Sequence, residues 1–124
     1  MKVLVVDDQE LNRTLLQFLL EEDGYEVSIA TNGREAIECF DEVSPDLVLL
    51  DVVMPVMDGF ATAPIIKKKA GELYLPIIFI TALDDQASLK RCLEVGGDDF
   101  LNKPFDKVIL SAKIRAHARI RALS

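Results

Sequence analysis

The stretch Val3-Leu4-Val5-Val6-Asp7-Asp8 places four apolar residues directly before two carboxylates. Three further strand-like runs, at 47–50, 77–80 and 99–102, are followed by Asp51, Thr81 and Lys103 respectively. Short apolar runs of this kind predict strands buried in a parallel sheet, and ligands bind outside the carboxyl ends of such strands. We therefore expect these polar side chains to meet at one edge of a sheet.

Short strand-like runs alternate along the chain with longer stretches of helical periodicity. The predicted strands are 2–6, 26–30, 46–50, 76–80 and 98–102, and the predicted helices are 10–22, 33–42, 60–70, 85–95 and 106–121. The residues expected on the buried helical faces are Leu11, Leu15, Phe18 and Leu19 in the first helix, and Ala36, Ile37 and Phe40 in the second. Right-handed crossovers then predict a flavodoxin-like α/β fold, a (βα)5 three-layer sandwich with a five-stranded parallel sheet in the order 2-1-3-4-5.

Length and composition indicate one domain that spans residues 1–124, because half of the residues are apolar and the chain is too short for two full domains. The net charge of −7 argues against nonspecific binding to nucleic acid or to an anionic membrane. We find no signal peptide and no apolar run near the roughly 20 residues that span a bilayer, so we expect a cytoplasmic protein. Cys39 and Cys92 lack the close spacing of zinc ligands and are expected to be small core residues in a reducing compartment.

Carboxylates held close together repel one another unless a cation or a shared proton stabilises them. A site built from oxygen ligands favours Mg²⁺, with Asp8 and Asp51 as direct ligands and Asp7 acting directly or through water. A carboxylate can also be the nucleophile in phosphoryl transfer, and Asp51 has the best position for that role. Lys103 supplies a positive charge for a phosphoryl oxygen, and the Thr81 hydroxyl can donate to another.

These motifs together resemble those of the receiver domains of two-component response regulators, a family that includes a single-domain chemotaxis regulator. The similarity covers nearly the whole chain. It rests on the segments Val5-Val6-Asp7-Asp8, Asp51-Val52-Val53-Met54-Pro55-Val56-Met57-Asp58-Gly59, Thr81-Ala82 and Lys103-Pro104-Phe105.

The resemblance implies a phosphorylation-dependent switch rather than an enzyme that turns over external substrates. Asp51 would accept a phosphoryl group from a histidine kinase or a histidine phosphotransfer protein. The groups that would organise Mg²⁺ are Asp7, Asp8, Asp51 and the backbone carbonyl of Val53. Lys103 would pair with the phosphoryl group, and Thr81 and Phe100 would move together in the switch. By the same analogy, Pro104 would follow a cis peptide bond.

The resemblance also gives expectations about partners. The face formed by the predicted segments 85–95, 98–102 and 106–121 often carries a homodimer or output contact in this family. Helical periodicity continues to Leu123, so we expect the chain to be the N-terminal part of a longer response regulator with an output domain or target protein. Leu89 and Ile109 are apolar where DNA-binding regulators place charges, so direct nucleic-acid binding is not expected.

Several of these residues also have simpler interpretations. Asp7-Asp8 alone is compatible with a helix cap, and Asp58-Gly59 is better explained as a turn or cap than as a ligand. Phe100 taken by itself fits the core. Lys67-Lys68-Lys69 is expected to be a solvated helix end, and His117 is expected at a surface or an interface.

Pro64 falls inside the third predicted helix, so that helix either begins late or bends there. Val53 and Leu83 would flank the site with apolar side chains. Because polar groups there could orient an attacking water, we expect a comparatively long-lived phosphoryl state.

Three other classes of protein remain as alternatives. A phosphatase of the haloacid-dehalogenase type needs a second acid two positions after its nucleophile, and Val53 occupies that place here. A degenerate receiver would bind partners without phosphate, although the full set of polar residues argues against it. A nucleotide-binding flavodoxin-like protein would need a glycine-rich loop after the first strand, and the sequence has none there.

Overall fold

A computed structural model describes all residues of the chain, Met1–Ser124. The strands are β1 (Lys2–Val6), β2 (Glu26–Ala30), β3 (Leu47–Leu50), β4 (Ile77–Thr81) and β5 (Asp99–Asn102). The helices are α1 (Glu10–Glu22), α2 (Gly33–Val43), α3 (Gly59–Ala70), α4 (Gln86–Glu94) and α5 (Lys107–Leu123). All ten predicted elements are present, and their ends lie within two residues of the predicted ones.

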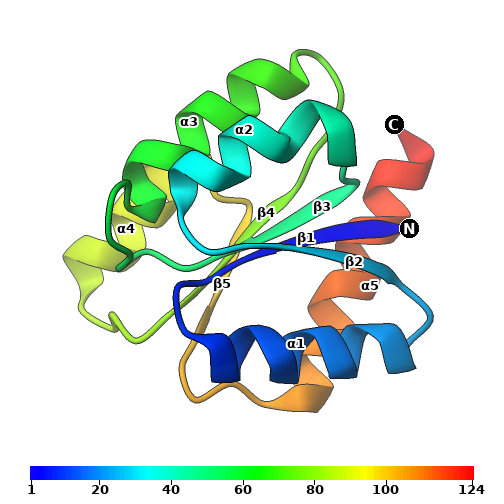
Figure 1. Cartoon of the computed structure of the whole chain (residues 1–124), viewed down its shortest axis with the longest axis horizontal. Helices are drawn as coiled ribbons and strands as arrows, with labels where there is room; N and C mark the ends of the chain where they lie inside the picture. The colour runs from blue at the N-terminus through cyan, green and yellow to red at the C-terminus, as the bar shows by residue number, and fades with distance from the viewer.

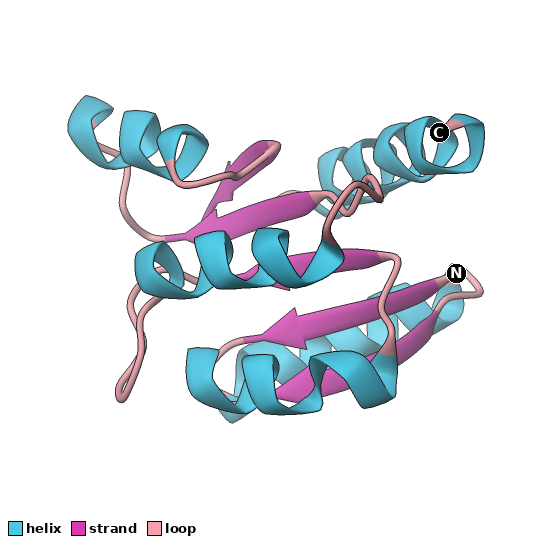
Figure 2. Cartoon of the chain, turned by 90° about the horizontal axis from the view of Figure 1, so that it is seen from above, coloured by secondary structure: helices cyan, strands magenta, loops and turns pink.

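The five strands form one parallel sheet in the order β2-β1-β3-β4-β5, as the sequence predicts. The strands point the same way when the molecule is seen from above (Figure 2). Helices α2, α3 and α4 cover one face of the sheet, and α1 and α5 cover the other (Figure 1). This flavodoxin-like arrangement brings the carboxyl ends of β1 and β3 side by side at the centre of the sheet.

Each face of the sheet has its own hydrophobic core, because alternate strand residues point to opposite faces. Leu4, Val48 and Phe79 pack with the helices on the α2 side. Val5, Leu49 and Ile78 pack with α1 and α5 on the other side. Most strand residues are therefore fully buried, which agrees with their almost continuous apolar sequence.

The predicted buried face of α1 is wrong. Leu16 and Leu20 are the buried residues of this helix, whereas Leu11 is 80% exposed and Phe18 is 61% exposed. Leu15 is also exposed. The helix carries two apolar stripes, and its periodicity cannot indicate which of them meets the sheet. The second stripe remains on the surface as an apolar strip. In α2 the prediction is confirmed for Ala36 and Phe40, which are buried.

Helix α3 begins at Gly59, so the suggestion that Pro64 delays its start is wrong. The Asp58 side chain caps the helix by accepting a hydrogen bond from the Ala61 N–H, at 2.8 Å. This confirms the interpretation of Asp58-Gly59 as a cap. Pro64 is exposed within the helix, where its missing N–H costs one backbone hydrogen bond.

Lys67, expected in a solvated helix end, and His117, expected at a surface or an interface, both make specific contacts at the amino-terminal edge of the sheet. Lys67 donates to Asp98 Oδ2 at 2.6 Å and to the Leu75 carbonyl at 2.7 Å, so it is not simply part of a solvated helix end. The side chain of His117 is 12% exposed, and its ring lies between the Tyr74 hydroxyl at 2.9 Å and Asp99 at 3.3 Å. Both side chains therefore tie helices to the sheet.

The two cysteines are free thiols. Cys92 is buried in the core on the α2 side, as predicted, and Cys39 is half-buried against the same core. Burial raises the pKa of both thiols, which is typical of packing residues rather than reactive ones.

Candidate functional site

Backbone hydrogen bonds bring the predicted site residues to one edge of the sheet. The Asp51 N–H donates to the Val6 carbonyl at 3.0 Å, which joins the ends of β3 and β1. The Lys103 N–H donates to the Thr81 carbonyl at 2.8 Å, which joins the ends of β5 and β4. The peptide bond between Lys103 and Pro104 is cis, as the resemblance implied. The four predicted positions therefore lie around one point.

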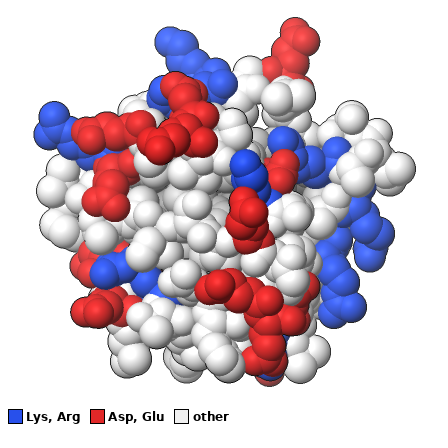
Figure 3. All heavy atoms as spheres, turned by 45° about the vertical axis from the view of Figure 1, so that its right-hand side comes forward, with Lys and Arg blue, Asp and Glu red and all other residues white.

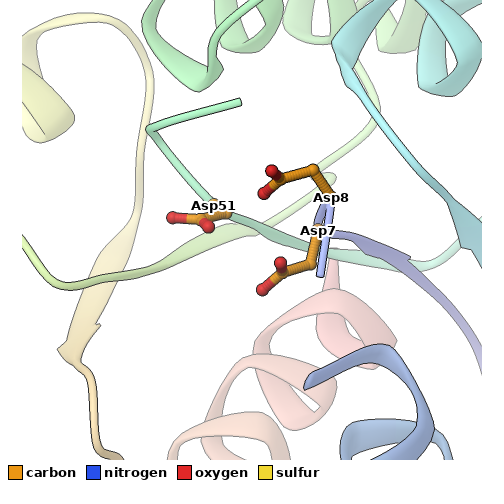
Figure 4. A group of neighbouring side chains, drawn as sticks. All are labelled: Asp7, Asp8 and Asp51. Atoms are coloured by element: carbon orange, nitrogen blue, oxygen red, sulfur yellow. The ribbon is translucent and has the colours of Figure 1, made fainter. Parts of the chain in front are cut away.

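Asp7, Asp8 and Asp51 form a compact group of carboxylates at this edge (Figure 4). Each contributes an oxygen, and these oxygens all lie within 4.8 Å of one another. Asp7 and Asp51 are buried, with 2% and 6% of their surface exposed, whereas Asp8 is open to solvent. The group is thus recessed on one side and accessible on the other.

One cation serves the two buried acids of this group. Lys103 Nζ lies 2.8 Å from Asp7 Oδ2 and 2.8 Å from Asp51 Oδ2. Burial by itself lowers the pKa of Lys103, but its hydrogen bonds with Asp51 and Asp7 outweigh burial and raise the pKa. Burial is the largest effect on Asp51 and raises its pKa; Lys103 lowers it, the neighbouring Asp7 raises it, and the pKa is raised overall. A single ammonium therefore leaves this acidic group short of positive charge.

Asp7 also shapes the turn between β1 and α1, but it does not cap the helix, because Gln9 is at the N-cap position and no side chain caps α1. Its Oδ1 accepts a hydrogen bond from the Gln9 N–H at 2.9 Å, just before α1 begins. Its backbone carbonyl accepts a hydrogen bond from Arg13 Nη1 at 2.8 Å. The sequence analysis missed Arg13, since nothing in its spacing from Asp7 indicates a contact with the backbone. These bonds fix the direction in which the Asp7 carboxylate points.

Thr81 and Phe100 lie on the adjacent strands β4 and β5. Thr81 is fully buried, and its Oγ1 accepts a hydrogen bond from the Leu83 N–H at 3.2 Å. Phe100 is half-buried and packs against the core on the α2 side. Asn102 donates to the Leu83 carbonyl at 2.9 Å, so the loop after β4 is held on two sides.

A hollow of about 360 Å³ opens over the acidic group. Its lining includes Asp8, Asp51, Thr81 and Lys103, together with Val53 and Gln9. Gln9 is the one member that the sequence analysis did not single out, although it directly follows Asp8. The Val53 side chain is 62% exposed, so an apolar group forms part of the rim.

The donor set fits Mg²⁺, which takes oxygen ligands, keeps several waters and is usually bound by one or two carboxylates. Three carboxylates with one accessible member supply such ligands. The nearby ammonium and hydroxyl are the groups that phosphoryl transfer requires for charge neutralisation.

The surface away from this site has no large region of one charge on the face seen in Figure 3, where basic and acidic side chains lie next to one another. None of the helices combines the length and the apolar character needed to cross a bilayer.

Comparison with known proteins gives one consistent result. The family model described as the response regulator receiver domain matches residues 3–115. The response regulator PleD of Caulobacter vibrioides is 42% identical over 120 residues, which cover 97% of this chain and 26% of PleD. A two-component response regulator from Clostridium difficile superposes with a TM-score of 0.90 at 32% identity and 96% coverage of both chains. The Vibrio cholerae chemotaxis protein CheY4 superposes with a TM-score of 0.86 at 31% identity, covering 93% of this chain and 96% of CheY4.

The chain is much shorter than the curated relatives it matches. It spans about a quarter of PleD and about half of the transcriptional regulatory protein PhoP of Bacillus subtilis. The similarity therefore concerns one unit of those proteins, and it does not extend to the rest of them.

Proposed function

The chain belongs to the response regulator receiver domain family, and from this premise we propose that Asp51 is the phosphoryl acceptor of its site. Receiver domains act in phosphorylation-dependent signalling and are not conventional enzymes. The observation that carries the proposal is the buried Asp51 carboxylate, which shares one ammonium with Asp7 beside the exposed Asp8. An incoming phosphoryl group and a divalent cation would complete the charge balance that Lys103 leaves open.

The reaction is a displacement at phosphorus. An oxygen of Asp51 attacks the phosphorus of a phosphohistidine, the N–P bond breaks, and its electron pair stays on the imidazole nitrogen. Asp7, Asp8, Asp51 and the Val53 carbonyl would hold Mg²⁺, which supplies positive charge to the transferring group when it is bound. Lys103 stabilises the product by pairing with a phosphoryl oxygen, and the Thr81 hydroxyl donates to another. The movement of Thr81, with that of Phe100, passes the change to the surface.

The partner that supplies the phosphoryl group is a histidine kinase or a histidine phosphotransfer protein. This partner docks on the exposed apolar strip of α1 of this chain, which is formed by Leu11, Leu15 and Phe18. Leu15 also lines a hollow that shares Gln9 and Lys103 with the acceptor site. Leu15→Glu should therefore slow labelling by a phosphorylated partner and leave labelling by acetyl phosphate unchanged.

The output side is the face formed by α4, β5 and α5. Leu93 on α4 is 51% exposed, and Ile109 and Ile120 on α5 are each 48% exposed. Such side chains suit a homodimer contact or the docking of an output domain or target protein. Because the curated relatives are longer than this chain, we expect the whole protein to carry an output domain.

Intact mass after incubation with Mg²⁺ and acetyl phosphate tests the acceptor assignment. We expect one phosphoryl adduct that is absent when Mg²⁺ is chelated and absent in Asp51→Asn. Asp46→Asn, at the other edge of the sheet, should still form the adduct. A folded, Mg²⁺-loaded protein that forms no adduct would instead support the phosphate-independent binding module.

The lifetime of the adduct reports on the rim of the site. Because the apolar Val53 side chain cannot orient water, we expect slow hydrolysis of the phosphoryl group. Val53→Asn should shorten the half-life of the adduct, measured by its decay after the phosphodonor is removed.

A further inference from the structure

The loop between β3 and α3 directly follows the acceptor residue, and its backbone is strained. Val56 has a φ of 69°, in the left-handed region that β-branched residues rarely adopt. A conformation of this kind persists only where the surrounding structure holds it in place. Contacts with the surrounding structure therefore hold this loop.

The first residue of α2 contacts the end of the loop. The Gly33 N–H donates to the Met57 carbonyl at 3.2 Å. A Cβ at position 33 would lie 2.9 Å from the Met57 carbonyl oxygen and 1.8 Å from Thr62 Oγ1. No side chain fits here unless the loop or helix α3 moves, so the close approach requires glycine.

The other contacts of the loop leave little room for it to yield. Thr62 is fully buried, and its hydroxyl donates to the Asp58 carbonyl at 2.6 Å. The Gly59 N–H donates to the Val52 carbonyl at 2.8 Å. The loop is therefore fixed at Val52 by the start of α3 and at Met57 by the start of α2.

We propose that Gly33 is a positioning residue for the metal site, although it belongs to α2 and does not line the acceptor hollow. Through Met57 and Thr62 it fixes the backbone of the loop that places Val53 beside Asp51 and Asp8 in the lining of the hollow. This inference rests on the proposed role of the Val53 carbonyl as a Mg²⁺ ligand. Groups that orient metal ligands typically change metal affinity 10- to 100-fold when they are mutated.

A Mg²⁺ titration of the Gly33→Ala variant, monitored by NMR, tests the proposal. We expect its Mg²⁺ dissociation constant to rise about tenfold, since the added methyl group displaces the loop. Adding Thr62→Ala removes the closest obstructing atom, so it should recover part of the affinity, but not beyond the level of a variant that lacks only the Thr62 hydrogen bond. Phe40→Leu is the control, because it weakens the core near the other end of α2, where Phe40 lines a hollow with Ala70 and Leu73, and it should bind Mg²⁺ like the wild type.

Thr62→Val provides a second measurement in case Gly33→Ala does not fold. It keeps the shape of the side chain but removes the hydrogen bond to the Asp58 carbonyl, and it should also weaken Mg²⁺ binding. Unchanged affinity in a folded Gly33→Ala or Thr62→Val protein, or equal weakening in Phe40→Leu, overturns the positioning role. A wild-type protein that binds no Mg²⁺ overturns the proposed metal site itself, so the two failures are distinguishable.

Discussion

The two edges of the sheet each carry three aspartates, but their charge balances differ. At the amino-terminal edge, Asp46 precedes β3, while Asp98 and Asp99 lie at the start of β5. Each of them has its own cation: Arg121 at 3.0 Å, Lys67 at 2.6 Å and Lys113 at 2.6 Å respectively. At the carboxyl-terminal edge, Asp7 and Asp51 share Lys103, and Asp8 lies beside them in solvent.

Backbone N–H groups bind acids at both edges, and at the carboxyl-terminal edge Asp51 accepts one from Val52 at 2.7 Å and Asp7 accepts one from Gln9 at 2.9 Å. Asp46, Asp98 and Asp99 each accept a backbone N–H at 2.8 Å, in addition to the cation. Burial alone would raise the pKa of Asp46 and Asp99, but these hydrogen bonds and the paired cations hold both pKa values below the ordinary one. At the other edge burial dominates, and the pKa of Asp51 is raised. One edge is neutralised for stability, whereas the other leaves a charge deficit for a ligand to fill.

Lys103→Met should have the largest effect, because it removes the cation that pairs with both the Asp7 and the Asp51 carboxylates. We expect the free energy of unfolding to fall by about 3 kcal/mol, as when one partner of a buried ion pair is deleted. Mg²⁺ should restore part of this loss, since it binds the folded state and replaces the missing charge. Urea denaturation with and without Mg²⁺ measures both effects.

Lys107→Met is the matched control for that substitution. Lys107 lies 3.6 Å from Glu22, and both side chains are about half exposed, so its loss should cost less than about 0.5 kcal/mol. If Lys103→Met costs no more than this control, the buried acidic group does not depend on Lys103.

Asp98→Ala tests the neutralised edge. It removes the partner of both Lys67 and the Ile77 N–H, so we expect a loss of about 2 kcal/mol in the free energy of unfolding. Mg²⁺ should not change this loss, because the amino-terminal edge needs no further cation. A Mg²⁺-dependent recovery in this variant would contradict the contrast between the edges.

Acid should destabilise the protein through the same edge. Because the folded-state pKa values of Asp46 and Asp99 lie below 3.8, the unfolded chain binds more protons between the folded and unfolded values. The stability that they contribute is therefore complete above the unfolded value, and it is lost as the pH falls through the lower folded values. Asp46→Asn should flatten this decline, and urea denaturation from about pH 5 to about pH 2 measures it.

The acceptor edge could be predicted from the sequence, because each polar residue directly follows a recognisable strand. The amino-terminal edge could not be, since Asp46 and Arg121 pair over 75 positions and no local pattern connects them. The contacts that Lys67 and His117 make with Asp98 and Asp99 were missed for the same reason. On α1, periodicity showed that an apolar face exists but could not distinguish Leu16, which meets the sheet, from Leu11, which remains exposed.

The smallest effect has the most informative sign. The raised pKa of Asp51 means that its charged form is unfavourable in the folded, metal-free protein. Asp51→Asn should therefore stabilise the metal-free protein by an amount on the order of 1 kcal/mol. The same change at Asp46 should destabilise the protein, because it removes an acid that is fully paired. Thermal unfolding without Mg²⁺ compares the stabilities of the two variants. Adding Mg²⁺ should then stabilise Asp46→Asn, which keeps all three carboxylates of the metal site, but not Asp51→Asn. If both variants lose stability, Asp51 is satisfied by Lys103 alone, and the charge deficit at the acceptor edge does not exist.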